Sequence, residues 1–274
     1  MSQSVASEAL PFRLAIFTAT RWEFRSVQES ITVDESLAIA GTRGIVGRVG
    51  RVHVYVFQSG IGLQNAYRVS QAVLSLQSWD LVISSGFAGA LVPCDIGTLV
   101  NGHAVLLDQA AEVPGFLHSR PIVCDEYFQA KVSEVASSLG SERRSGTIVS
   151  TSRIVGTGRE KHSLAVRTNA VALDMESASL GQMAREQHIP FLVVRTISDL
   201  VDEDLPVDFN LFLQPKLWPK GIGQILRRPL CLLRMLTLRN HMLVASRQLT
   251  VFFQEFFNCM SRGSCSSDIS HSRF

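Results

Sequence analysis

The segment Val171–Asp199, which reads VALDMESASLGQMAREQHIPFLVVRTISD, contains two short apolar runs separated by a stretch with helical spacing. The pattern predicts strands over Val171–Met175 and Phe191–Ile197 and a helix over Glu176–Gln187. His188-Ile189-Pro190 interrupts the pattern at the point where the helix must end. We therefore interpret this segment as a strand–helix–strand (βαβ) unit.

The same alternation extends through most of the chain. Further strands are predicted at residues 13–20, 52–58, 81–85 and 147–150, and further helices at residues 21–31 and 64–76. The evenly spaced Gly44, Gly47 and Gly50 are typical of a hairpin or loop. Strands that alternate with helices predict an α/β fold with a largely parallel or mixed central sheet covered by helices on both faces.

Composition indicates one large folded unit with an extension. The 274 residues are 46% hydrophobic and 18% charged, which supports a sizeable core and excludes a mainly disordered chain. We expect an α/β domain over residues 11–205 and a basic, apolar, helical extension over residues 206–274. The net charge of only +2 argues against a nucleic-acid partner.

Cysteine and histidine usage excludes several kinds of site. The five cysteines form no CxxC pair, and the histidines form no HExxH motif, so neither a disulfide framework nor a metal site is predicted. Residues 1–10 lack the features of a secretory signal, and no apolar run approaches 18 residues. We expect a cytoplasmic protein without a metal.

Acidic side chains follow both strands of the βαβ unit. Asp174 and Glu176 lie at its first junction and Asp199 at its second, and ligands of α/β sheets bind at the carboxyl ends of strands. Taken singly, Glu176 is compatible with a first-turn helix carboxylate and Asp199 with a turn or N-cap residue. Glu23, which follows the first strand, is compatible with a solvated helix position. Together, however, the acidic groups at the two junctions of the βαβ unit are expected to converge on one pocket.

Two glycine segments follow predicted strands and indicate close approach of the backbone to another group. They are QSGIG at 58–62 and SSGFAGAL at 84–91. Neither segment has the spacing of a P-loop or of a dinucleotide fingerprint. Ser59, Ser85 and Ser198 lie outside any GxSxG elbow, so serine-hydrolase chemistry is not predicted.

In this order, the motifs resemble those of the methylthioadenosine/S-adenosylhomocysteine nucleosidases and their nucleoside phosphorylase relatives. The matching segments are IFTATRWEF at 16–24, QSGIGLQNA at 58–66, SSGFAGAL at 84–91, and ALDMESASL with FLVVRTISDL at 172–200. The resemblance implies a three-layer phosphorylase-like fold, a homodimer, no cofactor, and a nucleoside substrate from which adenine is released.

The resemblance also implies roles for individual residues. Glu23 would activate the attacking water, Asp199 would protonate the purine, and Glu176 would hold the ribose hydroxyls. The implied substrate-binding residues are Gly86, Phe87, Ala88, Ile154, Val155, Met175, Glu176, Arg195 and Ser198. The sequence departs from the family at Ile154, where an aromatic residue is usual, and at Phe87, where serine is common; both departures alter the expected contacts with base and water.

Water and phosphate are the alternative nucleophiles in this superfamily. Phosphate binding needs several cationic or N–H donors in one place. Ser84 occupies the position that corresponds to a phosphate-binding arginine, and a phosphate loop is not evident after the first strand. We therefore expect hydrolysis, with phosphorolysis as the alternative.

The C-terminal extension has the charge pattern of a membrane-surface segment. No acidic residue lies between Asp208 and Glu255, while seven Lys and Arg residues lie among apolar ones. We expect peripheral membrane contact through residues 216–257, with a helix docked on the core or on a second subunit as the alternative. The DMES motif, SDLVDEDLPVDFN and this tail resemble the hopanoid-associated branch, which implies adenosylhopane as substrate. Methylthioadenosine or S-adenosylhomocysteine is the competing choice, and a silent nucleoside- or lipid-binding protein is the alternative class.

Overall fold

The structure, a computed structural model, describes residues 11–115, 120–213, 216 and 231–262. The expectations for the first ten residues, for Cys265 and for the basic residues Lys220, Arg227 and Arg228 lie outside these ranges. Within them, no helix combines the length and hydropathy needed to cross a membrane.

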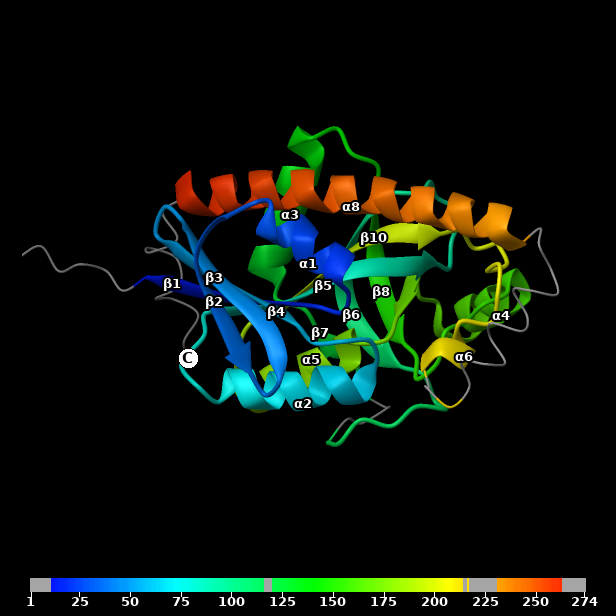
Figure 1. Ribbon diagram of the computed structural model, residues 1–274, viewed down its shortest axis with the longest axis horizontal. Helices are drawn as coiled ribbons and strands as arrows, with labels where there is room; N and C mark the ends of the chain where they lie inside the picture. Colours follow the sequence, from blue (N-terminus) through cyan, green and yellow to red (C-terminus); the bar gives the residue numbers. More distant parts are fainter. Residues whose placement is uncertain (1–10, 116–119, 214–215, 217–230, 263–274) are drawn as a thin grey trace, which may run out of the picture.

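One mixed sheet runs through the molecule (Figure 1). Its strands are β1 (Phe12–Thr18), β2 (Thr32–Ile39), β3 (Thr42–Val49), β4 (Val52–Gln58), β5 (Leu81–Ala90), β6 (Leu99–Leu107), β7 (Ile122–Val123), β8 (Arg143–Ser150), β9 (Ala172–Asp174) and β10 (Phe191–Asp199). The order is β10-β6-β8-β9-β5-β1-β4-β3-β2, and β10 also pairs with β5. That second pairing closes β5, β9, β8, β6 and β10 into a small barrel, beside which β1 to β4 extend as an open sheet.

Helices cover both faces of the sheet. They are α1 (Arg21–Gln28), α2 (Leu63–Leu74), α3 (Glu126–Ser138), α4 (Gly158–Thr168), α5 (Ser177–Glu186), the short α6 (Asn210–Leu213) and the long α8 (Cys231–Arg262). Figure 1 shows α1, α3 and α8 on one side and α2 and α5 on the other. The predicted three-layer α/β fold with a mixed sheet and a C-terminal helix is therefore confirmed.

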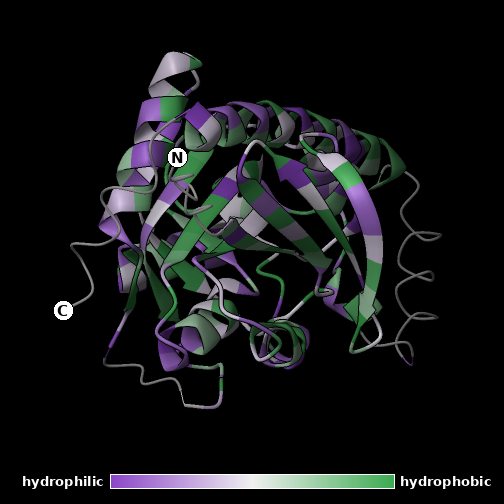
Figure 2. Cartoon of the chain, turned by 90° about the vertical axis from the view of Figure 1, so that its left-hand side faces the viewer, coloured by the Kyte–Doolittle hydropathy of each residue, from purple (hydrophilic) through white to green (hydrophobic). Residues whose placement is uncertain are grey.

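Strand β1 shows how the sheet buries both faces. Leu14 and Ile16 belong to the apolar core under α1, α3 and α8, while Ala15 and Phe17 belong to the core under α2 and α5. Successive side chains of a strand point to opposite faces, so a strand buried on both sides is apolar throughout. Figure 2 shows many strand residues between the helical layers in the hydrophobic colour.

The interpretation of Val171–Asp199 as a βαβ unit needs correction. The strands β9 and β10 and the helix α5 lie where the pattern predicted them, but β9 runs antiparallel to β5 whereas β10 runs parallel to it. The two strands are therefore not related by a parallel crossover. The three-residue β9 instead pairs with both β5 and β8 and closes the barrel.

Two strands, β2 and β3, lack the apolar run or alternation that would predict a strand from the sequence. The first five residues of β2 are exposed, so this edge strand carries no apolar run. Strand β3 contains Gly44 and Gly47 and forms a hairpin with β4 through Gly50, whose φ is 58°. A side chain at Gly47 would meet the Thr32 carbonyl oxygen at 2.3 Å, so glycine is required for β2 to pair there. The hairpin that the glycine spacing favoured is confirmed.

Helix α8 is docked on the core over its C-terminal half. The buried residues there are Ala245, Leu249, Phe252, Phe253, Phe256, Phe257 and Met260. Ser246 and Ser26 of α1 share a hydrogen bond of 2.7 Å between their hydroxyl oxygens. The C-terminal half of α8 is therefore docked on the core, which is one of the alternatives expected for the extension. The first turns of the helix, in contrast, have exposed leucines.

Candidate active site

Glu23 is fixed by the first turn of its own helix. Thr20 and Glu23 form a capping box at the start of α1, in which Glu23 Oε2 accepts hydrogen bonds from Ala19 N at 2.9 Å and Thr20 N at 2.6 Å. The Thr20 hydroxyl donates to the same oxygen at 2.9 Å. The Glu23 side chain is only 4% exposed, so it is not the solvated helix residue that its position allowed.

The other carboxylate oxygen of Glu23 is turned toward β5. Its Oε1 accepts a hydrogen bond from Phe87 N at 2.8 Å. A side chain at Gly86 would lie 2.5 Å from this oxygen and 2.8 Å from a terminal guanidinium nitrogen of Arg195. The first glycine of the SSGFAGAL segment is thus required because a carboxylate and a guanidinium pass against the strand.

Glu176 meets the other glycine segment. It is the N-cap residue of α5, but its side chain makes no capping hydrogen bond. Instead, Glu176 Oε1 accepts from Gly62 N at 2.8 Å. Gly62 has a φ of 96°, a conformation that favours glycine, so the QSGIG turn is built to present an N–H group to this carboxylate. The helix-terminus interpretation of Glu176 is therefore correct for its backbone and incomplete for its side chain.

A buried ion pair lies behind these carboxylates. Arg195 on β10 is 1% exposed and donates to Asp174 Oδ2 at 2.7 Å and 3.0 Å. Arg195 also donates to the hydroxyls of Ser84 and Ser177, and the Ser150 hydroxyl donates to Asp174 Oδ1 at 2.5 Å. Ser84 occupies the position at which the phosphorylases have a phosphate-binding arginine. In this protein its hydroxyl is instead a hydrogen-bond partner of Arg195. The network holds the start of α5 against β5 and β10.

Asp199 ends β10 and contacts a residue that the sequence analysis did not identify. The fully buried ammonium of Lys161 on α4 lies 2.5 Å from Asp199 Oδ2. The Ser198 hydroxyl donates to Asp199 Oδ1 at 3.0 Å. A side chain at Gly89 would approach Asp199 Oδ2 to 2.9 Å, so the second glycine of SSGFAGAL makes room for this carboxylate.

The structure brings the three predicted acids to one cavity of about 320 Å³. Of the predicted site residues, those that line it are Glu23, Phe87, Ala88, Ile154, Val155, Met175, Glu176, Ser198 and Asp199. Gly86 and Arg195 lie behind the lining. Asp174 also lines the cavity, so four carboxylates face one space.

Part of the cavity lining is apolar and comes from segments distant in sequence. This part includes Ile61, Leu205, Phe209, Leu238 and Met242. Leu238 and Met242 belong to α8 and lie four residues apart, so both project from one side of the helix. Sequence reasoning missed them because their neighbours in the chain are basic and their role depends on where α8 docks.

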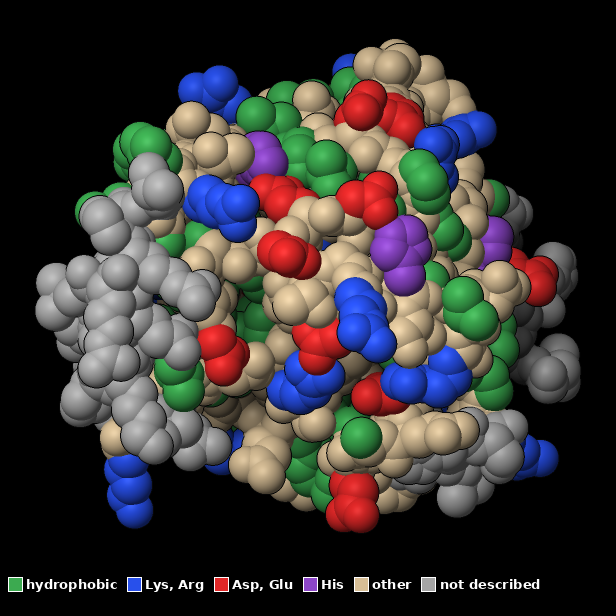
Figure 3. Space-filling view, turned by 90° about the vertical axis from the view of Figure 1, so that its right-hand side faces the viewer, with side chains coloured by type: hydrophobic (Ala, Val, Ile, Leu, Met, Phe, Trp, Pro, Cys, Tyr) green, Lys and Arg blue, Asp and Glu red, His purple; other side chains and the backbone are tan. Residues whose placement is uncertain are grey.

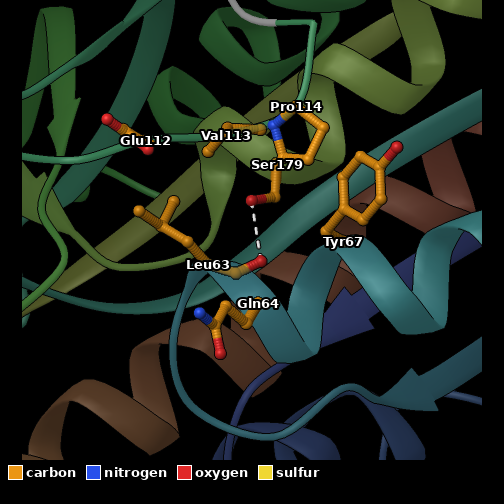
Figure 4. Close-up of a pocket in the computed structure, with 7 residues that line it drawn as sticks. All are labelled: Leu63, Gln64, Tyr67, Glu112, Val113, Pro114 and Ser179. Atoms are coloured by element: carbon orange, nitrogen blue, oxygen red, sulfur yellow. Dashed lines mark hydrogen bonds between the residues drawn. The ribbon is translucent and has the colours of Figure 1, made fainter.

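A second cavity of about 500 Å³ lies between α2, α5 and residues 112–114 (Figure 4). Its lining includes one carboxylate, that of Glu112. The hydroxyl of Ser179 already donates to the Leu63 carbonyl oxygen at 2.8 Å. This larger cavity therefore lacks the converging acids that mark the first as the candidate active site.

The surface around α4, α6 and the start of α8 carries charges of both signs. Figure 3 shows red and blue side chains interspersed over this end of the molecule, with histidines between them. Ion pairs such as Arg153–Glu160 and Arg167–Asp108 belong to this pattern, each with an N–O distance of 2.6 Å. Such a surface does not form the single-sign patch that a nucleic acid requires.

Burial and neighbouring charge change the protonation of the site. Burial, together with the negative charges of Asp174 and Glu23, raises the pKa of Glu176 to about 8 although Arg195 opposes the shift. Burial alone would lower the pKa of Arg195, but Asp174, Glu176 and Glu23 outweigh it and raise that pKa. Arg195 is therefore a permanent positive charge, whereas Glu176 holds a proton at neutral pH.

The raised pKa of Glu176 predicts a loss of stability with rising pH. Between the ordinary carboxyl value and about 8, the folded state binds a proton that the unfolded state has released, so stability falls as pH rises. Glu176→Gln stays neutral and lacks this loss. A shift of one pKa unit corresponds to about 1.4 kcal/mol of stability, and about 1 kcal/mol changes the melting temperature of a protein of this size by about 2–4 °C. The difference in melting temperature between Glu176→Gln and wild type should therefore rise in favour of the variant by at least about 2–4 °C from pH 5 to pH 9.

Melting curves at several pH values measure this effect. Glu134→Gln is the matched control, because Glu134 is exposed and paired with Lys131 on the surface. It should follow the wild-type profile. A Glu176→Gln profile parallel to wild type would contradict the proposed protonation.

Comparisons with known proteins agree on one family. A sequence profile of the phosphorylase superfamily matches residues 13–215. The chain is 26% identical over 210 residues to a 5′-methylthioadenosine/S-adenosylhomocysteine nucleosidase of Staphylococcus aureus. The aligned residues make up 73% of this chain and 92% of the relative. The structure is similar to that of the same nucleosidase from Helicobacter pylori, with a TM-score of 0.69, 20% identity and coverage of 91% and 99%. It is also similar to futalosine hydrolase of Helicobacter pylori, with a TM-score of 0.68, 21% identity and coverage of 90% and 97%. The chain therefore belongs to the phosphorylase superfamily.

Proposed function

We propose that this protein is a purine nucleosidase that hydrolyses the N-glycosidic bond of a 5′-substituted adenosine and releases adenine. The observation that carries the proposal is the convergence of Glu23, Asp174, Glu176 and Asp199 on one cavity. As the C1′–N9 bond breaks, positive charge grows on the ribose. The acidic side chains fixed around the ring present oxygen atoms to that charge and stabilise it more than they stabilise the neutral substrate.

Asp199 supplies the proton for the leaving group. The electron pair of the broken bond goes to adenine, which leaves poorly as an anion, and the proton of the Asp199 carboxyl group moves to N7. Ile154 and Val155 line the same cavity and offer the base an aliphatic surface. Asn210 fixes Ile154 through hydrogen bonds of 2.8 Å and 2.9 Å with its backbone. Packing thus replaces the aromatic stacking that is usual in the family.

Glu23 accepts the proton of the attacking water. Three of its four hydrogen bonds fall on Oε2, whereas Oε1 accepts only that from Phe87 N. A carboxylate oxygen accepts about two hydrogen bonds, so Oε1 retains capacity for a water in the cavity. The water oxygen bonds to C1′, and its proton goes to Glu23. The Phe87 side chain lines this region without offering a hydroxyl.

Water is favoured over phosphate as the nucleophile by the charge of the cavity. No Lys, Arg or His is among the described residues that line it, whereas four lining residues carry carboxyl groups. A phosphate dianion would meet repulsion there without a cationic partner. Arg195 lies behind the lining and is bound to Asp174.

Replacing Asp199 tests the proposed reaction. In phosphate-free buffer, wild type should release adenine and a free ribose derivative, and Asp199→Asn should lower the rate by about 10²- to 10⁴-fold because the general acid is lost. Asp202→Asn is the matched control, since the Asp202 side chain is 80% exposed and pairs with the surface His162. Adenine and sugar products are measured by chromatography.

Three outcomes would contradict this assignment. Undiminished adenine release in Asp199→Asn would remove the role of Asp199. A strict phosphate requirement with ribose 1-phosphate as product would identify a phosphorylase. Nucleoside binding without turnover, unchanged in Glu23→Gln, would identify a silent binding protein.

The apolar part of the lining favours a substrate whose 5′-substituent is large and apolar. Leu205, Phe209, Leu238 and Met242 line the cavity, and no cation among the described lining residues is available to the carboxylate of a homocysteine group. Burying such a charge without a partner is costly. Adenosylhopane is therefore our proposed substrate, giving ribosylhopane, whereas methylthioadenosine remains the small apolar competitor.

The first turns of α8 extend this apolar surface to the outside of the molecule. Leu232, Leu233 and Leu236 are 52%, 63% and 56% exposed. Arg234 and Arg239 lie on the same exposed turns. Exposed leucines beside arginines fit the surface of an anionic membrane. The proposed enzyme is a cytoplasmic homodimer that contacts the membrane peripherally through this part of the extension and takes its substrate from there.

Vesicle flotation tests the membrane contact. Replacing Leu232, Leu233 and Leu236 together with serine should reduce the partition coefficient of the protein onto anionic vesicles by at least about tenfold, because roughly 1.5–3 kcal/mol of transfer free energy is lost per leucine that inserts fully. Val166→Ser is the control, since Val166 is 88% exposed on α4. Point variants are preferable to truncation because the end of α8 is part of the core. Equal flotation of wild type and the triple variant would contradict the contact.

A further inference from the structure

Lys161 is a buried cation that the proposed reaction leaves unused. It is the fourth residue of α4 and is 0% exposed. Its ammonium contacts Asp199 Oδ2 at 2.5 Å and donates to the Leu200 carbonyl oxygen at 2.6 Å and the Glu203 carbonyl oxygen at 3.1 Å. Lysine is almost never fully buried unless it is paired. All three donors of this ammonium are thus engaged, one of them by the proposed general acid.

We propose that Lys161 is a positioning residue for Asp199, an inference that rests on the proposed nucleosidase function. Asp199 lines the cavity, whereas Lys161 does not and approaches its carboxyl group from behind. By holding Oδ2, the ammonium fixes the rotation of the carboxyl group and leaves Oδ1 to face the purine. Ser198 fixes Oδ1 from one side through its hydroxyl.

The charge of Lys161 also acts on the proton transfer. When Asp199 gives its proton to adenine N7, a negative charge appears on Asp199 within 2.5 Å of the ammonium. The ammonium stabilises this negative charge as it forms. The proton that reaches N7 comes from Asp199, which takes up a proton from solvent before each turnover.

The segment after β10 is also tied to the start of α4 by hydrogen bonds that do not involve the ammonium. Gly158 N donates to Asp204 Oδ1 at 2.8 Å, and Leu205 N donates to the Gly156 carbonyl oxygen at 2.8 Å. These bonds already tie residues 204 and 205 to the segment that begins α4. The costly burial of a lysine charge is therefore better explained by its contact with Asp199 than by loop architecture alone.

A double-mutant cycle separates a positioning role from a structural one. Lys161→Met keeps the volume of the side chain and removes the charge, and it should lower kcat for adenine release by about 10²-fold with KM little changed, as misplacement of a catalytic group does. In Asp199→Asn the same substitution should cause no further loss, because residues that act as one unit are not additive. Arg159→Met, an exposed position of the same helix, is the control.

A substrate with an activated leaving group gives a second readout. A 4-nitrophenyl riboside with the same 5′-substituent releases a phenolate that needs no proton, so Lys161→Met and Asp199→Asn should both cleave it at near wild-type rate. Lys161→Gln, which keeps hydrogen-bond donors without the charge, serves if the methionine variant does not fold. If wild type does not cleave this compound, the double-mutant cycle decides.

The outcomes are distinguishable from failure of the proposed function. If wild type releases no adenine, the nucleosidase proposal fails. If wild type releases adenine, the nucleosidase proposal stands, and three results would overturn the inference about Lys161. Lys161→Met could slow cleavage of the adenosine and of the nitrophenyl riboside equally, or it could lower the rate of Asp199→Asn further in the double variant. It could also leave the rate of adenine release unchanged.

Discussion

Four carboxylates share one cavity in this protein, and like charges close together in a water-poor site repel one another. Two buried cations and a backbone N–H group offset this repulsion. Arg195 neutralises Asp174, Lys161 faces Asp199, and Gly62 N donates to Glu176. The remaining repulsion is relieved by protonation of Glu176 rather than by another cation. These contacts and the protonation of Glu176 reduce the repulsion between the acids of the pocket.

Strand β5 makes this arrangement possible. It is shared by the open sheet and by the small barrel, so it pairs with β1, β9 and β10 within its ten residues. Gly86 admits the Glu23 carboxylate and the Arg195 guanidinium, and Gly89 admits Asp199. Side chains at these two positions would clash with Glu23, Arg195 and Asp199 where they now lie. The missing Cβ atoms of one strand therefore make room for two acids of the pocket.

The sequence was informative where burial leaves a pattern. The two-faced strands β1, β4 and β10 are apolar runs, and the ordered motifs around Glu23, Glu176 and Asp199 predicted a shared pocket. Edge strand β2 had no such pattern because it is exposed. Lys161 lies in a charged stretch, GREKHS, that is indistinguishable from a solvated helix face until α4 is placed against β10. The strand β9 was predicted, but its antiparallel direction was not, because three residues do not encode a strand direction.

Helix α8 joins two parts of the molecule that are made at different times. Its phenylalanines complete the apolar layer over β1 and β10, and its Leu238 and Met242 close the cavity whose acids come from the first two hundred residues. During synthesis, the acids of the pocket have all left the ribosome before this helix emerges. The nascent chain therefore has its chemical groups before it has the wall that surrounds them, and the site is complete only after α8 has emerged and docked.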